Sequence, residues 1–186
     1  MTKRDLRLTT IIVCLSVLLI ACGKKKESDN IITQRVEQPK TKEPVRMQEY
    51  TDERDVKWQD HQYHIAIHRQ PSDSLSSVQD ETGQVFIDNV FTVSVTNENG
   101  SVFWNRTFVK KDFKDYVNEA FYKTGILEGI VFDRVKDQTL IFAASVGRPQ
   151  TDEYIPLILS LSKTGHLTVK QDTQMDTVPN DEEENN

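Results

Sequence analysis

The chain has 186 residues, and its 23 lysines and arginines against 29 aspartates and glutamates give a formal net charge of −6 at pH 7. If residues 1–21 are removed, as argued below, 20 basic and 28 acidic residues remain and the net charge becomes −8. Phosphate binding needs a clustered basic surface, so this acidic balance argues against nucleic acid as a partner.

Residues 1–22 have the composition of a bacterial lipoprotein signal. A basic start is followed by an apolar stretch at residues 11–20, which is too short for a membrane span of ~20 residues. The stretch ends in Leu19-Ile20-Ala21-Cys22, the lipobox pattern of secretory precursors. We therefore expect cleavage before Cys22 and a lipid on Cys22 that anchors the protein in a membrane. An ordinary secretory signal and an uncleaved N-terminal anchor are the alternatives.

Cysteine usage limits the chemistry of the mature chain. The sequence has two cysteines, Cys14 inside the signal and Cys22 at the lipidation site. The mature chain would keep no free thiol, which excludes a disulfide, a cysteine-based zinc site and a catalytic cysteine. The sequence also contains no Gly-rich phosphate loop, nucleophile elbow or metalloprotease motif. We therefore expect no cofactor, and a binding protein rather than an enzyme.

The mature chain divides into three parts by composition. Residues 22–57 are polar and charged, and we interpret them as the lipidated cysteine and a flexible tether. Residues 58–171 are expected to form a single β-rich globular domain, and residues 172–186 a disordered acidic tail. Trp58, at the boundary of the tether, is expected to be exposed.

The domain shows a mostly alternating pattern of apolar and polar residues, which places one face of a strand on a core. Short polar segments at residues 97–100, 135–138 and 163–165 predict hairpin turns and therefore an antiparallel order. Pro156 lies inside a strong strand pattern, so we expect that strand to be an edge strand or to be bulged there. The expected strands lie near residues 63–67, 91–95, 102–109, 127–135, 140–146, 155–161 and 166–170.

One segment has helical spacing instead. Apolar side chains at 113, 116, 117, 120 and 121 would share one face of a helix, with Asp112 as its N-cap and Gly125 as its C-terminal stop. We expect this helix to pack its aromatic stripe on the sheet. The predicted fold class is α+β, mainly β: an antiparallel meander of about six to seven strands with one amphipathic helix packed on the sheet.

Several stretches of the domain carry a family resemblance: residues 80–83, 108–113, 125–133, 144–147 and 152–157. Through these stretches the chain resembles, from about Tyr63 to Lys170, an uncharacterised lipoprotein family of Bacteroidetes that is classed as a domain of unknown function. The resemblance implies a two-membrane envelope and export to the outer membrane. It implies no activity.

The resemblance also bears on location and modification. Surface lipoproteins of such organisms often carry an acidic run after the lipidated cysteine, whereas Gly23-Lys24-Lys25-Lys26 follows Cys22 here. We therefore favour the outer membrane with the domain facing the periplasm, and exposure at the cell surface is the alternative. Exported proteins of such organisms are O-glycosylated at Asp-Ser/Thr-aliphatic tripeptides, a pattern that Ser74 and Thr177 fit.

The histidines at positions 61, 64 and 68 form the one histidine cluster of the sequence. On the strand that the alternation predicts, His61 points away from the other two, and His64 and His68 lie about 13 Å apart at ~3.3 Å per residue. That distance is too long for one metal ion unless the strand is bulged. We expect a polar outer face rather than a metal site, with His64 and His68 as weak candidate ligands.

The segment from Gly147 to Tyr154 concentrates polar residues between two apolar strands. Arg148, Asp152, Glu153 and Tyr154 are candidate contacts for a ligand or partner, because loops on a rigid sheet often display binding groups. An ordinary exposed hairpin loop is the alternative. Asp152 and Glu153 would point in opposite directions on an extended chain, which argues against a glycosidase carboxylate pair.

Three functions stay open on the sequence. The one we favour is a non-catalytic envelope domain, held at the membrane by the lipid on Cys22, that binds a protein, peptide or glycan. The second is a lipid-anchored hydrolase or metal-dependent enzyme in which His64, His68 and the 147–154 segment meet. The third is a structural or assembly subunit that pairs through an exposed edge strand.

Replacement of the lipobox cysteine tests the expected anchor. Cys22→Ser removes the thiol that would carry the lipid, so we expect an uncleaved precursor that takes up no labelled fatty acid. The measurement is incorporation of labelled palmitate together with the mobility of the chain on a gel. Cys14→Ser is the control and should leave processing unchanged. A Cys22→Ser protein that is still cleaved and acylated would contradict the lipoprotein interpretation.

Overall fold

The computed structural model describes residues 42–173. Within this range the chain is mainly β, with two short helical segments. No helix of the described part is long and apolar enough to cross a membrane. Cys22, residues 23–41 of the expected tether, and Thr177 with most of the expected tail lie outside the described residues.

The strands are β1 (Tyr50–Trp58), β2 (His61–Pro71), β3 (Val78–Gln79), β4 (Val85–Phe86), β5 (Asn89–Asn97), β6 (Val102–Phe108), β7 (Ile126–Lys136), β8 (Thr139–Gly147), β9 (Tyr154–Leu161) and β10 (Leu167–Gln171). The helical segments are the 3-10 helix η1 (Lys110–Tyr116) and the α-helix α2 (Glu119–Thr124).

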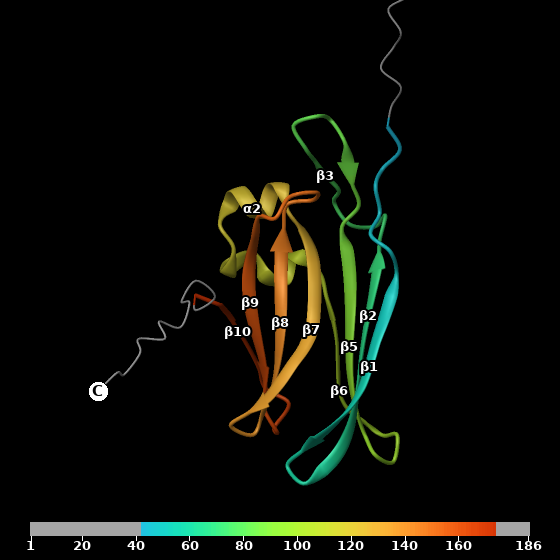
Figure 1. Ribbon diagram of the computed structural model, residues 1–186, viewed down its shortest axis with the longest axis vertical. Helices are drawn as coiled ribbons and strands as arrows, with labels where there is room; N and C mark the ends of the chain where they lie inside the picture. Colours follow the sequence, from blue (N-terminus) through green and yellow to red (C-terminus); the bar gives the residue numbers. More distant parts are fainter. Residues whose placement is uncertain (1–41, 174–186) are drawn as a thin grey trace, which may run out of the picture. The chain divides into compact units, whose positions relative to one another are not determined.

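Two four-stranded antiparallel sheets form the body of the domain (Figure 1). The first has the order β1-β2-β5-β6 and the second the order β10-β9-β8-β7, while β3 and β4 form a separate hairpin between β2 and β5. All seven strands expected from the sequence are present. The sequence prediction lacked β1, β3 and β4 and merged the two helical segments into one.

β1 extends the folded domain beyond the predicted boundary at residue 58. It pairs with β2 from Tyr50 opposite Arg69 to Trp58 opposite His61. The two residues of the connecting turn have φ angles of 51° and 64°, the left-handed region that two-residue hairpins require. Residues 50–57 therefore belong to the first sheet, whereas the sequence prediction placed them in the tether.

The inner faces of the two sheets enclose one hydrophobic core. Along β5 the side chains of Phe91, Val93 and Val95 are buried, while Thr92 and Ser94 between them are half-exposed. The alternation that predicted the strand therefore also assigned its faces correctly. The other core residues include Ile65, Ile67, Phe108, Leu127, Ile130, Leu140, Phe142, Leu157, Leu159 and Leu161.

Trp58 closes this core where the hairpin turns meet, so the prediction that it is exposed was wrong. Its side chain is 1% exposed, and its indole N–H donates to the Gln138 carbonyl oxygen at 3.0 Å, joining the two sheets. The ring lies 5.0 Å from the Tyr63 ring and 5.3 Å from the Phe103 ring, measured between centroids. Trp58 is covered because the domain begins upstream of it.

The expected single helix is interrupted at residues 117–118. Asn118 is the N-cap of α2, and its side-chain oxygen accepts a hydrogen bond from the Phe121 N–H at 3.0 Å. Asp112 lies inside η1 and accepts from the Val109 N–H at 2.8 Å, so it is not the cap of one long helix. Gly125 ends α2, as expected, and its N–H donates to the Phe121 carbonyl oxygen at 2.7 Å.

Pro156 lies in β9, which is an inner strand of the second sheet, so the expected edge strand was wrong. The Pro156 carbonyl oxygen accepts from the Asp172 N–H at 2.9 Å. In an antiparallel ladder the N and C=O of one residue point to the same side. The Pro156 nitrogen, which carries no hydrogen, therefore faces the end of β10. The loss of one ladder hydrogen bond there destabilises the sheet only slightly.

A buried polar cluster joins the two sheets at the end that carries the helical segments. Asp88 is 2% exposed; its Oδ1 accepts from the N–H groups of Asn89 and Leu127, both at 2.8 Å, and its Oδ2 lies 3.2 Å from Lys110 Nζ. Lys110 Nζ also donates to the Gly125 carbonyl oxygen at 2.6 Å. Burial of these charges is tolerated because each is paired and hydrogen-bonded.

Removal of the buried ammonium group tests how much this cluster stabilises the folded domain. Lys110→Met should lower the free energy of unfolding by about 3–5 kcal/mol, because Asp88 is left as an unpaired buried carboxylate. The measurement is urea denaturation. Lys111→Met, at the neighbouring exposed lysine, is the matched control and should change the free energy of unfolding by less than about 0.5 kcal/mol.

A second substitution separates charge pairing from lost packing. Asp88→Asn keeps an oxygen that can accept from the Leu127 N–H but removes the charge. In the Lys110→Met background it should therefore restore part of the lost stability. A double variant as unstable as the sum of the two single variants would contradict this assignment.

Candidate functional site

The predicted contact segment forms a compact loop between β8 and β9. The Arg148 N–H donates to the Glu153 carbonyl oxygen at 2.9 Å, and the Thr151 hydroxyl donates to the Arg148 carbonyl oxygen at 3.0 Å. The Glu153 N–H in turn donates to the Thr151 hydroxyl oxygen at 3.1 Å. Gln150, at the tip, has a φ angle of 61°. These bonds give the loop, residues 148–153, a defined shape.

Arg148 attaches this loop to α2. Its guanidinium forms an ion pair with Glu153, and its Nε donates to the Thr124 hydroxyl oxygen at 3.1 Å. The guanidinium carbon lies 4.6 Å from the centroid of the Phe121 ring, a cation–π distance. Arg148 therefore holds the loop in place, and its charge is matched within the protein.

A second structured turn lies opposite this loop, at the tip of the β3–β4 hairpin. Asp80 Oδ1 accepts from the Thr82 N–H at 2.9 Å, the Thr82 hydroxyl at 2.8 Å and the Gln84 N–H at 2.9 Å. Gly83 completes the turn with a φ of 80°, a conformation that favours glycine. The Thr82 hydroxyl, through its hydrogen bond, holds the pKa of the Asp80 carboxyl below its usual value. Asp80 is therefore ionised at neutral pH.

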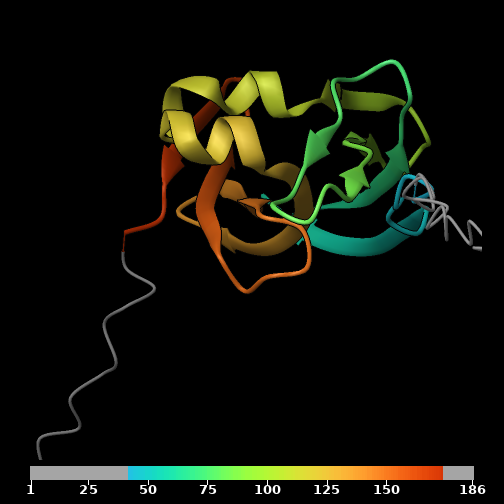
Figure 2. The same ribbon diagram turned by 90° about the horizontal axis from the view of Figure 1, so that it is seen from above.

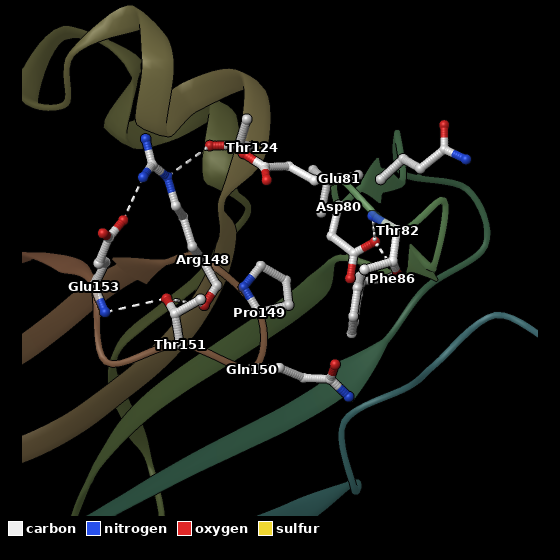
Figure 3. A pocket seen from close by; sticks show the side chains of 12 residues that line it. Asp80, Glu81, Thr82, Phe86, Thr124, Arg148, Pro149, Gln150, Thr151 and Glu153 are labelled. Atoms are coloured by element: carbon white, nitrogen blue, oxygen red, sulfur yellow. Dashed lines mark hydrogen bonds and ion pairs between the residues drawn. The ribbon is translucent and has the colours of Figure 1, made fainter.

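A pocket of about 490 Å³ lies between the hairpin and the loop, and we call it the hairpin pocket (Figure 3). Phe86 and Pro149 contribute apolar surface to it, and threonine and glutamine side chains supply hydrogen-bonding groups. Thr124 brings the end of α2 to the same wall. Its lining comprises Val78, Gln79, Asp80, Glu81, Thr82, Phe86, Thr124, Arg148, Pro149, Gln150, Thr151 and Glu153.

The charges at this pocket are mostly negative. Asp80, Glu81 and Glu153 face one cation, Arg148, and that cation is already paired with Glu153. Among the lining residues the two hairpin carboxylates have no matching cation, and Lys42 beside the lining, with its Nζ 3.4 Å from the Thr82 hydroxyl oxygen, offsets one of their two charges. The hairpin pocket is therefore better suited to a cationic or hydrogen-bonding group than to an anion.

A smaller apolar hollow of about 130 Å³ adjoins the hairpin pocket and shares Phe86, Pro149 and Gln150 with it. Its other walls come from the segment before β1, from the stretch after β4 and from the start of β7. The loop tip at Pro149 and Gln150 therefore separates two adjacent concave surfaces. The remaining lining residues of the hollow are Val45, Met47, Ile87, Ile126 and Glu128.

The four predicted contact residues divide between two surfaces. Arg148 and Glu153 line the hairpin pocket, whereas Asp152 and Tyr154 line a separate depression together with Phe121, to which Glu153 also contributes. The structure thus brings Arg148 and Glu153 together and directs Asp152 and Tyr154 elsewhere.

His64 and His68 lie on the outer face of the first sheet, each beside a carboxylate, whereas His61 lies opposite the buried Trp58 on the other face. His64 Nδ1 lies 2.9 Å from Asp55 Oδ1, and His68 Nε2 lies 3.3 Å from Glu49 Oε1. The described residues contain no group of three or more His, Cys, Asp or Glu side chains placed to hold a metal ion. The structure does not bring His64 and His68 to the 148–153 loop, which belongs to the other sheet.

Ser74, the glycosylation candidate within the described residues, lies in the exposed connection between β2 and β3. Its hydroxyl is 2.8 Å from that of Ser72, and the adjacent Asp73 forms a 2.5 Å ion pair with Arg46. The site is accessible to a modifying enzyme.

The sequence prediction missed the hairpin side of the pocket. Asp80, Thr82 and Gly83 form an Asp-x-Thr-Gly turn, and that residue pattern is a recognisable hairpin signal. Strands of two residues have no measurable alternation, so β3 and β4 themselves leave no signal in the sequence. The approach of the hairpin to Arg148 is a long-range contact that spacing does not reveal.

The hydrogen bond that sets the pKa of Asp80 can be removed. Thr82→Val deletes the hydroxyl donor, so the pKa of the Asp80 carboxyl should rise toward its usual value. The measurement is the carboxyl ¹³C chemical shift as a function of pH. Thr151→Val, at another threonine of the pocket, is the matched control and should leave the pKa of Asp80 unchanged. An unaltered pKa in Thr82→Val would show that the hydroxyl is not the cause.

Comparison with protein families gives a match to a domain of unknown function, DUF4738, over residues 29–169. Comparison with curated proteins gives no match. The matched range includes the buried Asp88–Lys110 pair, the β3–β4 hairpin and the 148–153 loop. It also covers well over half of the chain, so this protein belongs to the DUF4738 family.

Proposed function

We propose that this protein is a lipid-anchored envelope protein whose domain binds a protein, peptide or glycan in the hairpin pocket without catalysing a reaction. The lipid on Cys22 would hold it at the outer membrane, with the domain facing the periplasm. The observation that carries the proposal is the pocket itself. Two separately stabilised turns and the end of α2 present polar side chains to one concave space.

The chemistry of the lining supports binding over catalysis. Its ionisable side chains are three carboxylates and one arginine. The Thr82 hydroxyl does contact the Asp80 carboxylate, but a carboxyl group whose pKa is lowered is a weak general base. Hydrolysis by paired carboxylates requires one of them to hold a proton. The Thr82 hydrogen bond instead favours the ionised form of Asp80, and Glu153 is paired with Arg148.

The pocket lies at the end of the domain where the chain enters from the proposed anchor. Lys42 Nζ donates to the Thr82 hydroxyl oxygen at 3.4 Å, and the Val45 N–H donates to the Val85 carbonyl oxygen at 2.8 Å. Cys22 and Lys42 are 20 residues apart in sequence. At ~3.5 Å per residue, a lipid on Cys22 therefore keeps this end of the domain within about 70 Å of the membrane surface.

Site-specific crosslinking in intact envelopes tests this function. A photoreactive amino acid at Gln150, at the rim of the pocket, should form a reproducible adduct with an envelope component. The same amino acid at Asn99, in the exposed β5–β6 turn at the other end of the domain, is the control and should not. Adducts would be compared by immunoblot and mass spectrometry.

Competition within the pocket completes the test. Thr124→Arg places a bulky cation in the lining and should reduce the Gln150 adduct at least tenfold while the unfolding temperature stays within a few degrees. Equal adducts from Gln150 and Asn99, or an adduct that is insensitive to Thr124→Arg, would show that the hairpin pocket is not the binding site.

A further inference from the structure

We propose that the hairpin pocket binds an extended peptide segment, which adds as a strand to the free edge of β3 and places a basic side chain against the acidic rim. This inference rests on the proposed binding function and specifies its ligand. It is carried by the register of the hairpin, by the pairing on its opposite edge and by the charges of the rim.

The register shows which backbone groups of β3 are free. Gln79 lies opposite Val85, and the next pair along is joined by the Asp80 N–H, which donates to the Gln84 carbonyl oxygen at 3.0 Å. Paired residues of an antiparallel ladder alternate between bonded and non-bonded pairs. Gln79 and Val85 are therefore a non-bonded pair, and the N–H and C=O of each point away from the other strand.

The outer edge of β4 shows that this assignment is correct and that the hairpin accepts a third strand. The Val85 carbonyl oxygen accepts from the Val45 N–H at 2.8 Å, and the Ile87 N–H donates to the Val45 carbonyl oxygen at 2.9 Å. The segment before β1 is thus added in parallel to β4 by main-chain bonds. On the opposite edge of the hairpin, Gln79 likewise offers one N–H and one C=O, both from the same residue.

That opposite edge faces the pocket. Val78 and Gln79 line it, and the wall across from them is formed by Thr124 and the 148–153 loop. Seen from above, the green hairpin lies between the blue segment that precedes β1 and the yellow helical segments (Figure 2). A peptide strand beside β3 would therefore enter the 490 Å³ space and contact the end of α2, which lies close to β3.

The charges select a basic peptide. The three hydrogen bonds to Asp80 all end on Oδ1, so its Oδ2 is available to a ligand. Glu81 adds a second carboxylate on the same turn, while the Arg148 charge is matched by Glu153. Lys42 beside Thr82 offsets one of the two hairpin charges, so the turn keeps a net negative charge. A lysine or arginine of the peptide would be the partner of this turn.

A peptide fits the lining better than a glycan does. Sugar rings are commonly held on the face of an exposed aromatic side chain, and the one aromatic residue of the lining, Phe86, is 3% exposed. A short hydrogen-bonding edge with an apolar base suits an extended backbone instead.

A positional-scanning library of amidated hexapeptides, tested by fluorescence anisotropy on the full lipidated chain in detergent micelles, is the direct experiment. The expected result is selection of lysine or arginine at one position and a measurable Kd below about 1 mM. Two methylated forms of the best hexapeptide are then compared, one N-methylated at the odd-numbered amides and one at the even-numbered amides. One form should bind at least tenfold more weakly than the unmethylated peptide, and the other should bind almost as well. These two forms are the two alternations. Equal effects of both alternations, or selection of acidic residues, would overturn the proposal.

Two substitutions at one position provide the matched test on the protein. Gln79→Pro removes the outward N–H, and because that group is not part of the β3–β4 ladder the hairpin should persist. Gln79→Ala removes the same side chain but keeps the N–H. We expect Gln79→Pro to bind the hexapeptide at least tenfold more weakly than Gln79→Ala does, with similar unfolding temperatures. Equal binding by the two variants would overturn strand addition.

The outcomes separate this inference from the function on which it rests. If no hexapeptide binds while the Gln150 crosslinker still captures its component, the peptide inference is wrong and the binding function stands. If the Gln150 crosslinker also captures nothing, the binding function itself is wrong.

Discussion

The buried ion pair of Asp88 and Lys110 fixes how the two sheets meet. Asp88 precedes β5 of the first sheet, and it accepts a hydrogen bond from Leu127 in β7 of the second. Lys110 begins η1, and its ammonium group holds the carbonyl of Gly125, where α2 ends. An apolar core tolerates small shifts between its layers, whereas a buried charge pair is satisfied in one arrangement only. The pair therefore determines the alignment at this end of the domain.

The hairpin pocket depends on that alignment. Because Gly125 is fixed by Lys110, the preceding Thr124 is held where it meets Arg148 and lines the pocket. Ile126, the next residue along, packs with Val78 and Phe86 in a small separate cluster under the β3–β4 hairpin. Thr124 thus contacts the loop, Gly125 the ion pair and Ile126 the hairpin. A weakened ion pair would be expected to disturb the pocket before it disturbs the far end of the sheets.

The sequence predicted the parts of the fold that repeat and missed those that depend on distant contacts. The alternation located the strands near residues 63–67, 91–95 and 155–161 with their buried faces, four further strands were also expected where they occur, and the turn residues located three hairpins. β1 escaped because it is an edge strand whose inner positions include Asp52 and Arg54, so it lacks apolar alternation. The loop with Arg148 was identified from composition. The hairpin beside it could not be placed, because residues 80 and 148 meet only in the folded chain.

The edges of the sheets give a reason for strand addition at β3 rather than elsewhere. Long open sheet edges favour pairing between copies of a protein. The two longest edge strands are charged, with five charged residues in β1 and three between Asp133 and Lys136 in β7. β3 has none, but it is two residues long and opens into the pocket. So short an edge supplies main-chain bonds to about one residue of a ligand. Most of the affinity must therefore come from the acidic turn and from the apolar surface at Pro149, which makes the recognition selective.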